Sequence, residues 1–362
     1  GGGTPDTTIK SYWDGEIQWF TPSEIGKNKY VGSSLRTITE EGLNNSSAKL
    51  LPPNTLLLSS RATIGECSLS LRECATNQGF QSLVSKKCYV DFLYYLIQTK
   101  KRDLIRKSCG STFLEISANE VRKIQVSVPT DVEQQKIAGL LSLIDERIAT
   151  QNKIIEKLQS LIKGLSQQLL SSENDWILYR LDDLAQIKSG YSGTQVSYQT
   201  PYKVSRIETI SKHCIDIQRI GYVECIPESY RLNVGNILFS NINSIQYIGN
   251  TAYLDKDYGL YHGMNLLRII PNTTIVRPRF LHLLLCTDWA INHFQTICNK
   301  AVSQASINQT ALGKSRFPIP PMSVQQQICS MFELTERKLD NEQEYISCLQ
   351  QQKRYLLQKM FI

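Results

Sequence analysis

Histidine and cysteine are the side chains that most often bind metals or act as nucleophiles, and this sequence holds four histidines and ten cysteines. No two cysteines form a C-x-x-C pair, and no histidine has the H-E-x-x-H spacing or another ligand pattern. We interpret the cysteines as small buried apolar residues of a reduced, cytosolic protein. His282, within LHLLL, is interpreted as structural too.

Motifs for phosphate binding and nucleophilic catalysis are also missing from the sequence. GKS at 313–315 resembles the end of a phosphate-binding loop, but Asn308 stands where that loop requires glycine. PPN at 52–54 indicates a turn and not the N/D-P-P-Y/F motif of an adenine methyltransferase, and no G-x-S-x-G is found. We therefore predict no catalytic residue and no metal ligand in this chain.

The composition is that of a globular protein with more than one domain. The chain has 362 residues, of which 41% are hydrophobic and 20% are charged, and this length favours two or three domains. No run of about eighteen apolar residues indicates a membrane helix. The net charge of +7 permits binding to nucleic acid without requiring it.

A repeated phrase shows how these domains are arranged. VPTDVEQQKI at 128–137 returns as IPPMSVQQQI at 319–328, and a shift of 191 residues also places Lys123 on Lys314 and Leu165 on Leu356. Farther upstream, NTLLLSSRATIG at 54–65 resembles NILFSNINSIQ at 236–246. A repeat this long indicates a tandem domain duplication rather than a solenoid.

Each copy of the phrase leads into a long helix. Apolar residues in steps of three and four, from Ile137 to Leu169, predict a coiled-coil helix that begins near Asp131. The second helix, from Ile328, has a weaker seam that is interrupted by three polar residues, Thr335, Glu342 and Lys353. We expect the two helices to pack on each other as an antiparallel coiled coil.

Two interpretations of such a duplicated molecule remain open on the pattern alone. Two similar domains joined by paired helices suit a ligand that is itself nearly twofold, as the half-sites of double-stranded DNA are. A plain coiled-coil spacer or dimerisation module would show the same pattern.

Several segments, in order, resemble the specificity (S) subunit of type I restriction–modification systems. GGGTPDTTIKSYWDGEIQWFTPSEI (1–25) is similar to the opening of a target recognition domain, and segments 38–69 and 75–83 continue the pattern. VPTDVEQQKIAGLLSLIDERI (128–148) resembles the family's central conserved region. WILYRLDDLAQIKSG (176–190) resembles the start of a second recognition domain, and 319–328 the second conserved region.

The resemblance implies a mixed α/β (α+β) fold with two tandem target recognition domains, each followed by a long helix. The four expected ranges are the first recognition domain, the central helix, the second recognition domain and the C-terminal helix, at 1–127, 128–172, 173–317 and 318–362. By internal alignment we expect the first domain to lack about a dozen residues at its start, because the second begins with WILYRLDDLAQIKSG before its glycine. Either the chain is truncated there or that element comes from elsewhere.

The resemblance also implies partners. Each recognition domain would contact one half of a split double-stranded DNA target. Methyltransferase (M) subunits, two in number, would dock on the conserved helices, and nuclease–translocase (R) subunits could join them. S-adenosylmethionine, ATP and Mg²⁺ would be bound by those partners and not by this chain. The chain would lie in the cytoplasm of a bacterium or archaeon and would not bind a membrane. The alternative function is an S-like scaffold that binds M subunits without reading DNA.

Candidate DNA contacts in the first domain are chosen for their chemistry. Arg61 could bind a guanine edge or a phosphate, or it could be an ordinary surface arginine in a salt bridge. Asn77 and Gln78 could pair with adenine, although such residues also form turns. Ser111 and Thr112 offer hydroxyls after a glycine.

Matching candidates follow in the second domain and at the helix starts. The DNA candidates there share position or chemistry with those of the first domain: Arg206, Asn241, Asn243, His262 and Gln304. Docking of M subunits is assigned to the amides of the repeated phrase, which could instead cap and solvate their own helices: Gln134, Gln135, Gln325 and Gln326.

Overall fold

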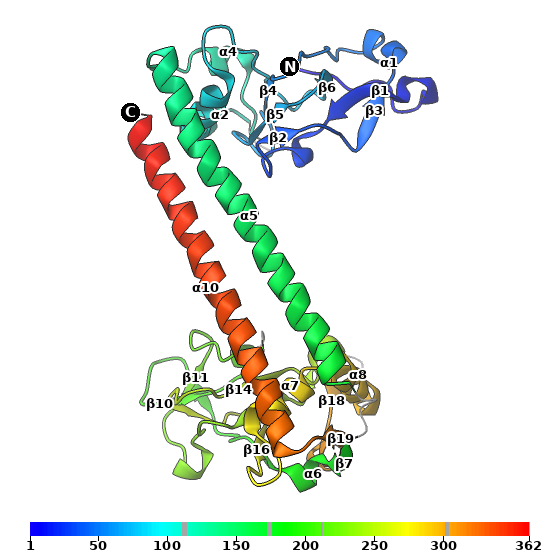
Figure 1. Cartoon of the computed structure of the whole chain (residues 1–362), viewed down its shortest axis with the longest axis vertical. Helices are drawn as coiled ribbons and strands as arrows, with labels where there is room; N and C mark the ends of the chain where they lie inside the picture. Colours follow the sequence, from blue (N-terminus) through cyan, green and yellow to red (C-terminus); the bar gives the residue numbers. More distant parts are fainter. Residues whose placement is uncertain (111–113, 172–175, 211–212, 301–303, 362) are drawn as a thin grey trace. The chain divides into compact units, whose positions relative to one another are not determined.

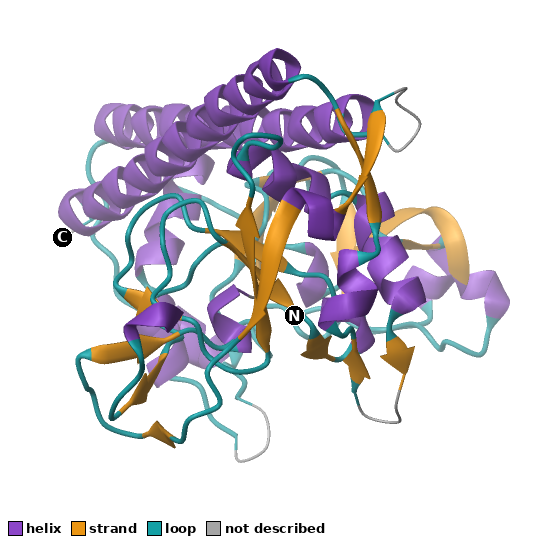
Figure 2. Ribbon diagram, turned by 90° about the horizontal axis from the view of Figure 1, so that it is seen from below, coloured by secondary structure: helices purple, strands orange, loops and turns teal. Residues whose placement is uncertain are grey.

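A computed structural model describes residues 1–110, 114–171, 176–210, 213–300 and 304–361. The chain forms two compact units, unit 1 with Gly1–Lys153 and Glu344–Ile362, and unit 2 with Ile154–Gln343 (Figure 1). Both combine short strands with helices (Figure 2), so the mixed fold with two tandem domains is confirmed. Within the described ranges, no helix is both long and apolar enough to cross a bilayer.

Two long helices contribute to both units. Helix α5 spans Asp131–Leu169 and helix α10 spans Met322–Met360, and the division between the units falls within each of them. The compact units therefore differ from the four predicted ranges, because each unit contains one stretch of each long helix. Acidic Asp131 and Glu133 occupy the first turn of α5, where they complement the helix dipole.

Within each unit the two helix stretches run antiparallel, as expected. In unit 1, Ile137 and Leu141 of α5 belong to the buried cluster against which Leu356 and Met360 of α10 pack. In unit 2, Ile162 and Leu165 of α5 pack against the cluster that contains Ile328 and Phe332. The apolar seams predicted from the sequence are thus the packed faces of the helices.

A polar residue of the second seam has a specific partner. Lys353 Nζ lies 2.6 Å from Asp145 Oδ1 of α5 and 5.6 Å from the centre of the Tyr95 ring. The Tyr95 hydroxyl donates to the other oxygen of the same carboxylate at 2.7 Å. The lysine that weakens the apolar pattern therefore joins α10 to α5 and to the globular part of unit 1.

The globular part of unit 1 contains two three-stranded sheets, β3-β1-β6 and β2-β5-β4. Its elements are β1 (Trp13–Phe20), β2 (Tyr30–Val31), β3 (Arg36–Ile38), α1 (Glu40–Asn44), β4 (Leu56–Leu58), β5 (Cys67–Ser70), β6 (Cys74–Thr76), α2 (Val90–Thr99), α3 (Lys101–Arg106) and α4 (Ala118–Arg122). Leu56 and Leu58 of β4 and the buried residues of α2 form one cluster with the start of α5.

The globular part of unit 2 is built around the sheet β14-β12-β16-β8, with further sheets β15-β10-β11-β9, β13-β18-β17 and β19-β7. Its strands are β7 (Ile177–Arg180), β8 (Ala185–Ser189), β9 (Gln195–Val196), β10 (Tyr202–Val204), β11 (Gly221–Val223), β12 (Ile237–Ser240), β13 (Ile242–Asn243), β14 (Thr251–Tyr253), β15 (Leu260–Tyr261), β16 (Leu266–Pro271), β17 (Asn299–Lys300), β18 (Ala305–Ser306) and β19 (Arg316–Ile319). Its helices are α6 (Leu181–Leu184), α7 (Pro278–Leu285), α8 (Asp288–Ile297) and α9 (Gln309–Gly313).

The opening glycines of each repeat serve a close backbone approach. A Cβ on Gly2 would lie 2.0 Å from the Thr76 carbonyl oxygen, and a Cβ on Gly190 would lie 1.8 Å from that of Gly263. Any larger residue would force these segments apart, which explains glycine at both positions.

Candidate nucleic-acid interface

Three segments far apart in the sequence meet in unit 1. They are the loop after β4, the turn after β6 and the described residues Cys109, Glu115 and Ile116. The Ser60 N–H donates to the Gly79 carbonyl at 2.9 Å, and the Ile116 N–H donates to the Ser60 carbonyl at 3.0 Å. Cys109 and Glu115 exchange backbone hydrogen bonds, each 2.9 Å long. This junction gathers the candidate residues Arg61, Asn77 and Gln78.

Arg61 is held in this junction by an ion pair. Its Nη2 lies 2.7 Å from Glu115 Oε2, and the side chains remain 43% and 38% exposed. Arg61 therefore forms a salt bridge, which was the alternative to a DNA contact. A guanidinium carries five N–H donors, however, and the exposed ones remain available to a ligand.

The two amides after β6 have different roles. Asn77 Oδ1 accepts a hydrogen bond from the Gly79 N–H at 2.9 Å, so Asn77 shapes the turn, as the structural alternative predicted. Gln78 is exposed, and its Oε1 accepts from the Thr4 hydroxyl at 2.7 Å. Ser111 and Thr112 lie outside the described residues.

Unit 2 forms the equivalent junction. The Ile307 N–H donates to the Asn241 carbonyl at 2.8 Å, as Ile116 does to Ser60. Strand β13 pairs with β18, which places Asn243 opposite Ala305, and exposed Gln304 directly precedes that strand. The structure thus brings three predicted residues together: Asn241, Asn243 and Gln304.

The side chains of Ser60 and Asn241 share an unusual feature. Ser60 Oγ and Asn241 Oδ1 are buried without a hydrogen-bond partner in the described part of the chain. Asn241 Nδ2 donates to the Ile307 carbonyl at 3.3 Å, which fixes the orientation of the amide. The two junctions therefore match in side-chain polarity as well as in backbone pairing.

His262 lies in the core and not at the surface. Its side chain is 1% exposed, and Nε2 lies 3.0 Å from the Leu266 carbonyl. Burial lowers the pKa of His262 to about 4, so the imidazole is neutral at physiological pH and supports the turn between β15 and β16. A direct base contact by this histidine, as the sequence suggested, would require the turn to open.

Arg206 lies beside the same turn but is exposed. The neighbouring Ser205 hydroxyl accepts a hydrogen bond from the Gly263 N–H at 3.0 Å, which connects this loop to the turn. Arg206 Nε lies 3.4 Å from Glu208 Oε2 in a surface ion pair. Such pairs contribute little stability, so the guanidinium can exchange its carboxylate for a phosphate at small cost.

The predicted docking glutamines separate into a buried and an exposed pair. Gln134 and Gln325 are 2% and 0% exposed, and both bind backbone groups at the start of their helices. Their neighbours Gln135 and Gln326 are exposed. Gln134 and Gln325 therefore support their own domains, while Gln135 and Gln326 remain accessible to a partner.

Two exposed leucines were missed by the sequence reasoning. Leu143 of α5 is 60% exposed and Leu334 of α10 is 64% exposed, and they are separated by the repeat length of 191 residues. Both lie outside the seam that the heptad pattern emphasised. A second set of apolar helix positions, repeated in both halves, was the signal that could have found them.

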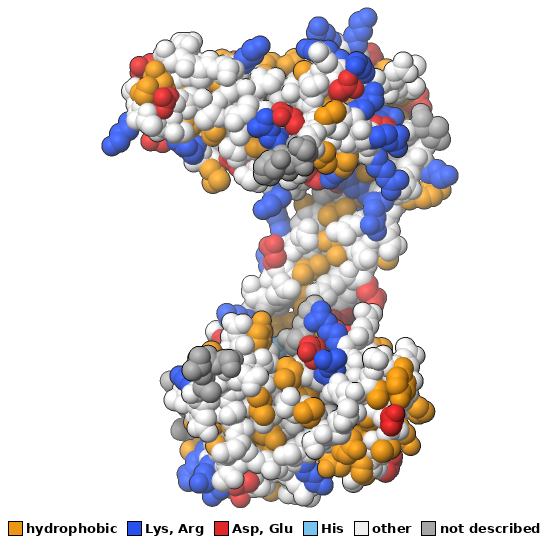
Figure 3. Space-filling view, turned by 180° about the vertical axis from the view of Figure 1, so that it is seen from behind, with side chains coloured by type: hydrophobic (Ala, Val, Ile, Leu, Met, Phe, Trp, Pro, Cys, Tyr) orange, Lys and Arg blue, Asp and Glu red, His pale blue; other side chains and the backbone are white. Residues whose placement is uncertain are grey.

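Basic residues also concentrate on one helix of unit 1. Helix α3 and its C-cap contain Lys101, Arg102, Arg106 and Lys107. On the face shown in Figure 3, Lys and Arg side chains gather at one end of unit 1. Helix α8 of unit 2 has no lysine or arginine.

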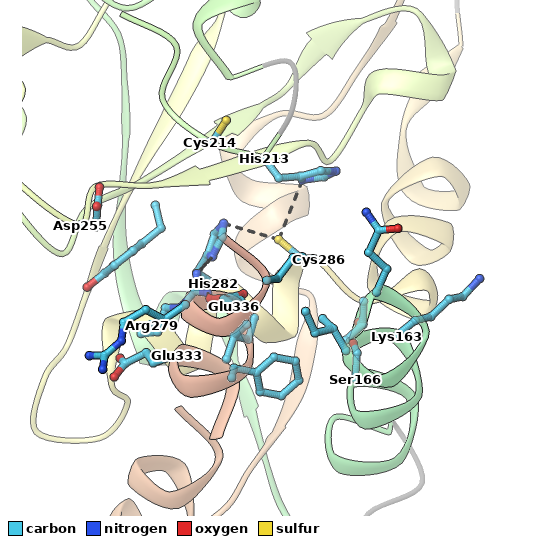
Figure 4. A pocket seen from close by; sticks show the side chains of 18 of the residues that line it. Lys163, Ser166, His213, Cys214, Asp255, Arg279, His282, Cys286, Glu333 and Glu336 are labelled. Carbon is cyan, nitrogen blue, oxygen red and sulfur yellow. Dashed lines mark hydrogen bonds and ion pairs between the residues drawn. The ribbon is translucent and has the colours of Figure 1, made fainter. Parts of the chain in front are cut away.

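A cleft of about 1310 Å³ in unit 2 brings a thiol and two imidazoles together (Figure 4). Cys286 Sγ lies 3.5 Å from His282 Nε2 and 3.9 Å from His213 Nδ1. Burial raises the pKa of Cys286 to about 11 and lowers the pKa of His282 to about 3. The pair is therefore a neutral thiol and a neutral imidazole, which is unsuited to nucleophilic catalysis.

Known proteins resemble this chain along most of its length. The family model of the type I restriction modification DNA specificity domain matches residues 1–160 and again residues 173–351. The type I restriction enzyme MjaIX specificity subunit of Methanocaldococcus jannaschii is 29% identical over 313 residues, which cover 72% of each chain. The EcoR124I/EcoR124II specificity subunit of Escherichia coli is 28% identical over 188 residues, 50% of this chain and 44% of that protein.

Solved structures share the fold. The S subunit of a type I restriction-modification system from M. genitalium superimposes with a TM-score of 0.59 at 16% identity, over 97% of this chain and 94% of that chain. A chain from a study of complex assembly in a type I R-M system gives a TM-score of 0.61 at 14% identity, over 91% of this chain and 90% of that chain.

Proposed function

This chain belongs to the type I restriction modification DNA specificity family, and on that premise we propose that each unit recognises one half of a bipartite double-stranded DNA target. One observation carries the proposal: in both units the loop after a core strand (β4 or β12) pairs its backbone with a later segment (Ile116 or Ile307), and polar side chains gather there. Two similar recognition units in one chain suit a DNA target made of two half-sites.

The side chains divide into those that would contact DNA and those that would hold the junction. In unit 1, Arg61 can donate to a guanine edge or a phosphate, and Gln78 can pair with adenine. In unit 2, Asn243 and Gln304 have the amide chemistry for adenine, and Arg206 suits a phosphate. Ser111 and Thr112 stay candidate contacts, whereas Asn77, Asn241 and His262 would act by holding the loops in place.

We propose further that the chain is not itself an enzyme and instead scaffolds methyltransferase subunits, two in number. Leu143 and Leu334 are exposed at equivalent positions, so each offers an apolar contact to one copy of the same partner. Exposed Gln135 and Gln326 would flank these contacts. Nuclease–translocase subunits could join the complex, and S-adenosylmethionine, ATP and Mg²⁺ would be bound by the partners, in the cytoplasm of a bacterium or archaeon.

A methylation map tests the proposal. The chain is co-expressed with the M subunit encoded beside it, and methylated adenines are mapped by single-molecule sequencing. We expect a split motif with two short specific halves. Replacing residues 1–127 with the corresponding domain of a relative should change one half and leave the other unchanged.

The same experiment distinguishes the alternative function. A complex that co-purifies but methylates no specific motif would indicate a scaffold without DNA reading. A chimera that changes both halves at once would overturn the assignment of one half to each unit.

A further inference from the structure

A row of three neighbouring side chains crosses the junction of unit 1. Glu115 pairs through its backbone with Arg61 on one side and with Cys109 on the other. Residues directly opposite each other in such pairing have their side chains on the same face, about 5 Å apart. Ile116, the next residue along the chain, is 0% exposed, whereas the side chains of the row all reach solvent. The row therefore lies on the outer face, because successive side chains of a strand point to opposite faces.

Unit 2 has a row at the equivalent place. Ser306 of β18 pairs with Ile242 of β13 on one side and with Asn299 of β17 on the other. The next residue, Ile307, is 1% exposed and so is buried as Ile116 is in unit 1. Asn299 is exposed and the other two side chains are half-buried, so this row faces outward too. We call the two sets the unit 1 row (Arg61, Glu115, Cys109) and the unit 2 row (Ile242, Ser306, Asn299).

The two rows differ in their chemistry. The unit 1 row contains an ion pair, and among the described residues this pair engages only Nη2 of Arg61 and Oε2 of Glu115. Further guanidinium donors and the second carboxylate oxygen therefore remain for a base pair. The unit 2 row carries no charge and combines the apolar side chain of Ile242 with the amide of Asn299. Different side chains at equivalent positions suit two units that recognise different base pairs.

The backbone that carries Arg61 is held in a tight turn. The Arg61 carbonyl accepts hydrogen bonds from the Thr63 N–H at 2.6 Å and from the Ser59 hydroxyl at 2.9 Å. Ala62, at the centre of this turn, has a φ of 60°, a left-handed conformation that is uncommon for residues other than glycine. The turn and the ion pair together fix the place of the guanidinium, so little side-chain freedom is lost when it binds.

The backbone around each row has a shape that fits DNA. Strands β17 and β18 pair as an antiparallel ribbon in unit 2, and Cys109 and Glu115 exchange two backbone hydrogen bonds at the same place in unit 1. The major groove of B-DNA admits a two-stranded β-ribbon, and each base pair shows a different pattern of donors and acceptors there. Side chains in a row across the ribbon can therefore distinguish one base pair from another.

Resting on the proposed function, we propose that these rows select one base pair in each half-site, a G·C pair for unit 1 and an A·T pair for unit 2. Arg61 donates to O6 and N7 of guanine, and Glu115 accepts from N4 of the paired cytosine. In unit 2, Asn299 pairs with N6 and N7 of adenine, and Ile242 contacts the methyl group of the paired thymine.

Single substitutions test each row in the complex with the M subunit. The methylation map of the unmodified complex gives the two halves of the motif, and the chimera of residues 1–127 assigns one half to each unit. Arg61→Ala should lower the preference for one G·C pair in the unit 1 half by roughly 5- to 150-fold and leave every other position unchanged. Asn299→Ala should do the same to one A·T pair in the unit 2 half. Arg72→Ala, in the turn between β5 and β6, and Asn292→Ala, on α8, remove the same groups at exposed sites and should leave the motif intact.

Exchange of the row tests the proposal by a gain of function. The triple variant Arg61→Ile, Glu115→Ser and Cys109→Asn gives unit 1 the side chains of the unit 2 row. We expect the G·C pair of the unit 1 half to be replaced by an A·T pair, while the unit 2 half stays the same. A new preference of this kind cannot arise from a unit that has failed to fold.

A modified base tests the direct contact of Arg61. A duplex with 7-deazaguanine at the assigned position lacks the N7 acceptor, and its affinity for the complex is measured by fluorescence anisotropy. The modified base should weaken binding of the unmodified complex several-fold and should cause no further loss in the Arg61→Ala complex, because the partner of N7 is already missing. A purely structural role of Arg61 would make the two losses independent.

The outcomes distinguish this inference from the proposed function. A split motif that Arg61→Ala and Asn299→Ala leave unchanged would overturn the assignment of the rows and would leave the proposed function standing. A triple variant that keeps the G·C pair, or independent losses with 7-deazaguanine, would also overturn the assignment. An unmodified complex that methylates no split motif would overturn the proposed function, and the inference with it.

Discussion

Gln134 and Gln325 make the same hydrogen bond in the two units. The side-chain oxygen of Gln134 accepts from the Tyr89 N–H and that of Gln325 accepts from the Arg277 N–H, each at 2.8 Å. Tyr89 and Arg277 are the N-caps of α2 and α7. Each glutamine thus joins the start of a long helix to the start of a helix in the globular part.

The other end of each amide completes this connection. The Nε2 atoms of Gln134 and Gln325 donate to the carbonyls of Pro129 and Pro320, both at 2.9 Å. The amide therefore satisfies a free N–H at one helix start and a carbonyl just before another. The proline and the first glutamine of the repeated phrase are explained by these two hydrogen bonds.

Replacing the buried glutamine should destabilise its unit. Gln325→Met keeps the length of the side chain but leaves the Arg277 N–H and the Pro320 carbonyl without this partner. We expect a loss of about 1–3 kcal/mol in the free energy of unfolding, measured by urea denaturation. Gln326→Met, at the exposed neighbour, is the control and should change stability by less than about 0.5 kcal/mol. Equal effects of the two substitutions would contradict the role assigned to Gln325.

The regular and repeated parts of the fold could be predicted from the sequence. Steps of three and four from Ile137 onward identified the packed face of α5, because helix periodicity is a local property. The 191-residue repeat identified two tandem units, because similar sequences fold into similar structures. The family motifs added the order of the domains.

The candidate site was harder to predict, because burial is decided by distant segments. His262 had suitable chemistry for DNA, and only the pairing of its loop with Tyr191 and Tyr230 shows that it is enclosed. Gln134 and its exposed neighbour Gln135 look alike in the sequence, and the turn of the helix separates them. Long-range contacts of this kind leave no local pattern to read.

Buried histidines should make unit 2 sensitive to mild acid. Burial lowers the pKa of His262 from 6.5 to about 4. Below pH 6.5 the unfolded chain takes up a proton that the folded chain refuses, so the stability from this group is complete above pH 6.5. It falls by about 1.4 kcal/mol per pH unit as the pH drops toward 4. Urea denaturation at several pH values measures this slope.

The matching variant isolates the contribution of this one group. His262→Gln retains a hydrogen-bonding side chain without a titrating proton. It should lower stability at pH 7 and reduce the dependence of stability on pH between 6.5 and 4. A variant with the slope of the unmodified chain would show that other groups, such as carboxylates, control the acid response.

Replacing either exposed leucine with glutamate should remove one M subunit from the complex. Leu143→Glu and Leu334→Glu each place a carboxylate at a contact that we assign to one M subunit. Each should weaken one M site by about 2–3 kcal/mol, or roughly 30- to 150-fold in Kd. Native mass spectrometry should then show complexes with a single M subunit, and the double variant should bind neither. Leu35→Glu is the control, and two M subunits on either single variant would contradict the assignment.

The basic helix α3 of unit 1 should contribute more than other basic residues to the salt dependence of DNA affinity. Lys101 packs over Gly65, whereas Phe294 packs over the corresponding Gly249 of unit 2, so a cation in one unit replaces a buried ring in the other. If α3 contacts the DNA backbone, Arg102→Ala with Arg106→Ala should lower the slope of log K against log salt by about two units. The methylated motif should stay the same, because phosphate contacts carry no sequence information. Lys153→Ala with Lys157→Ala, on the exposed face of α5, removes the same charge and should leave the slope nearly unchanged. Equal changes in both double variants would mean that net charge, and not α3, controls the affinity.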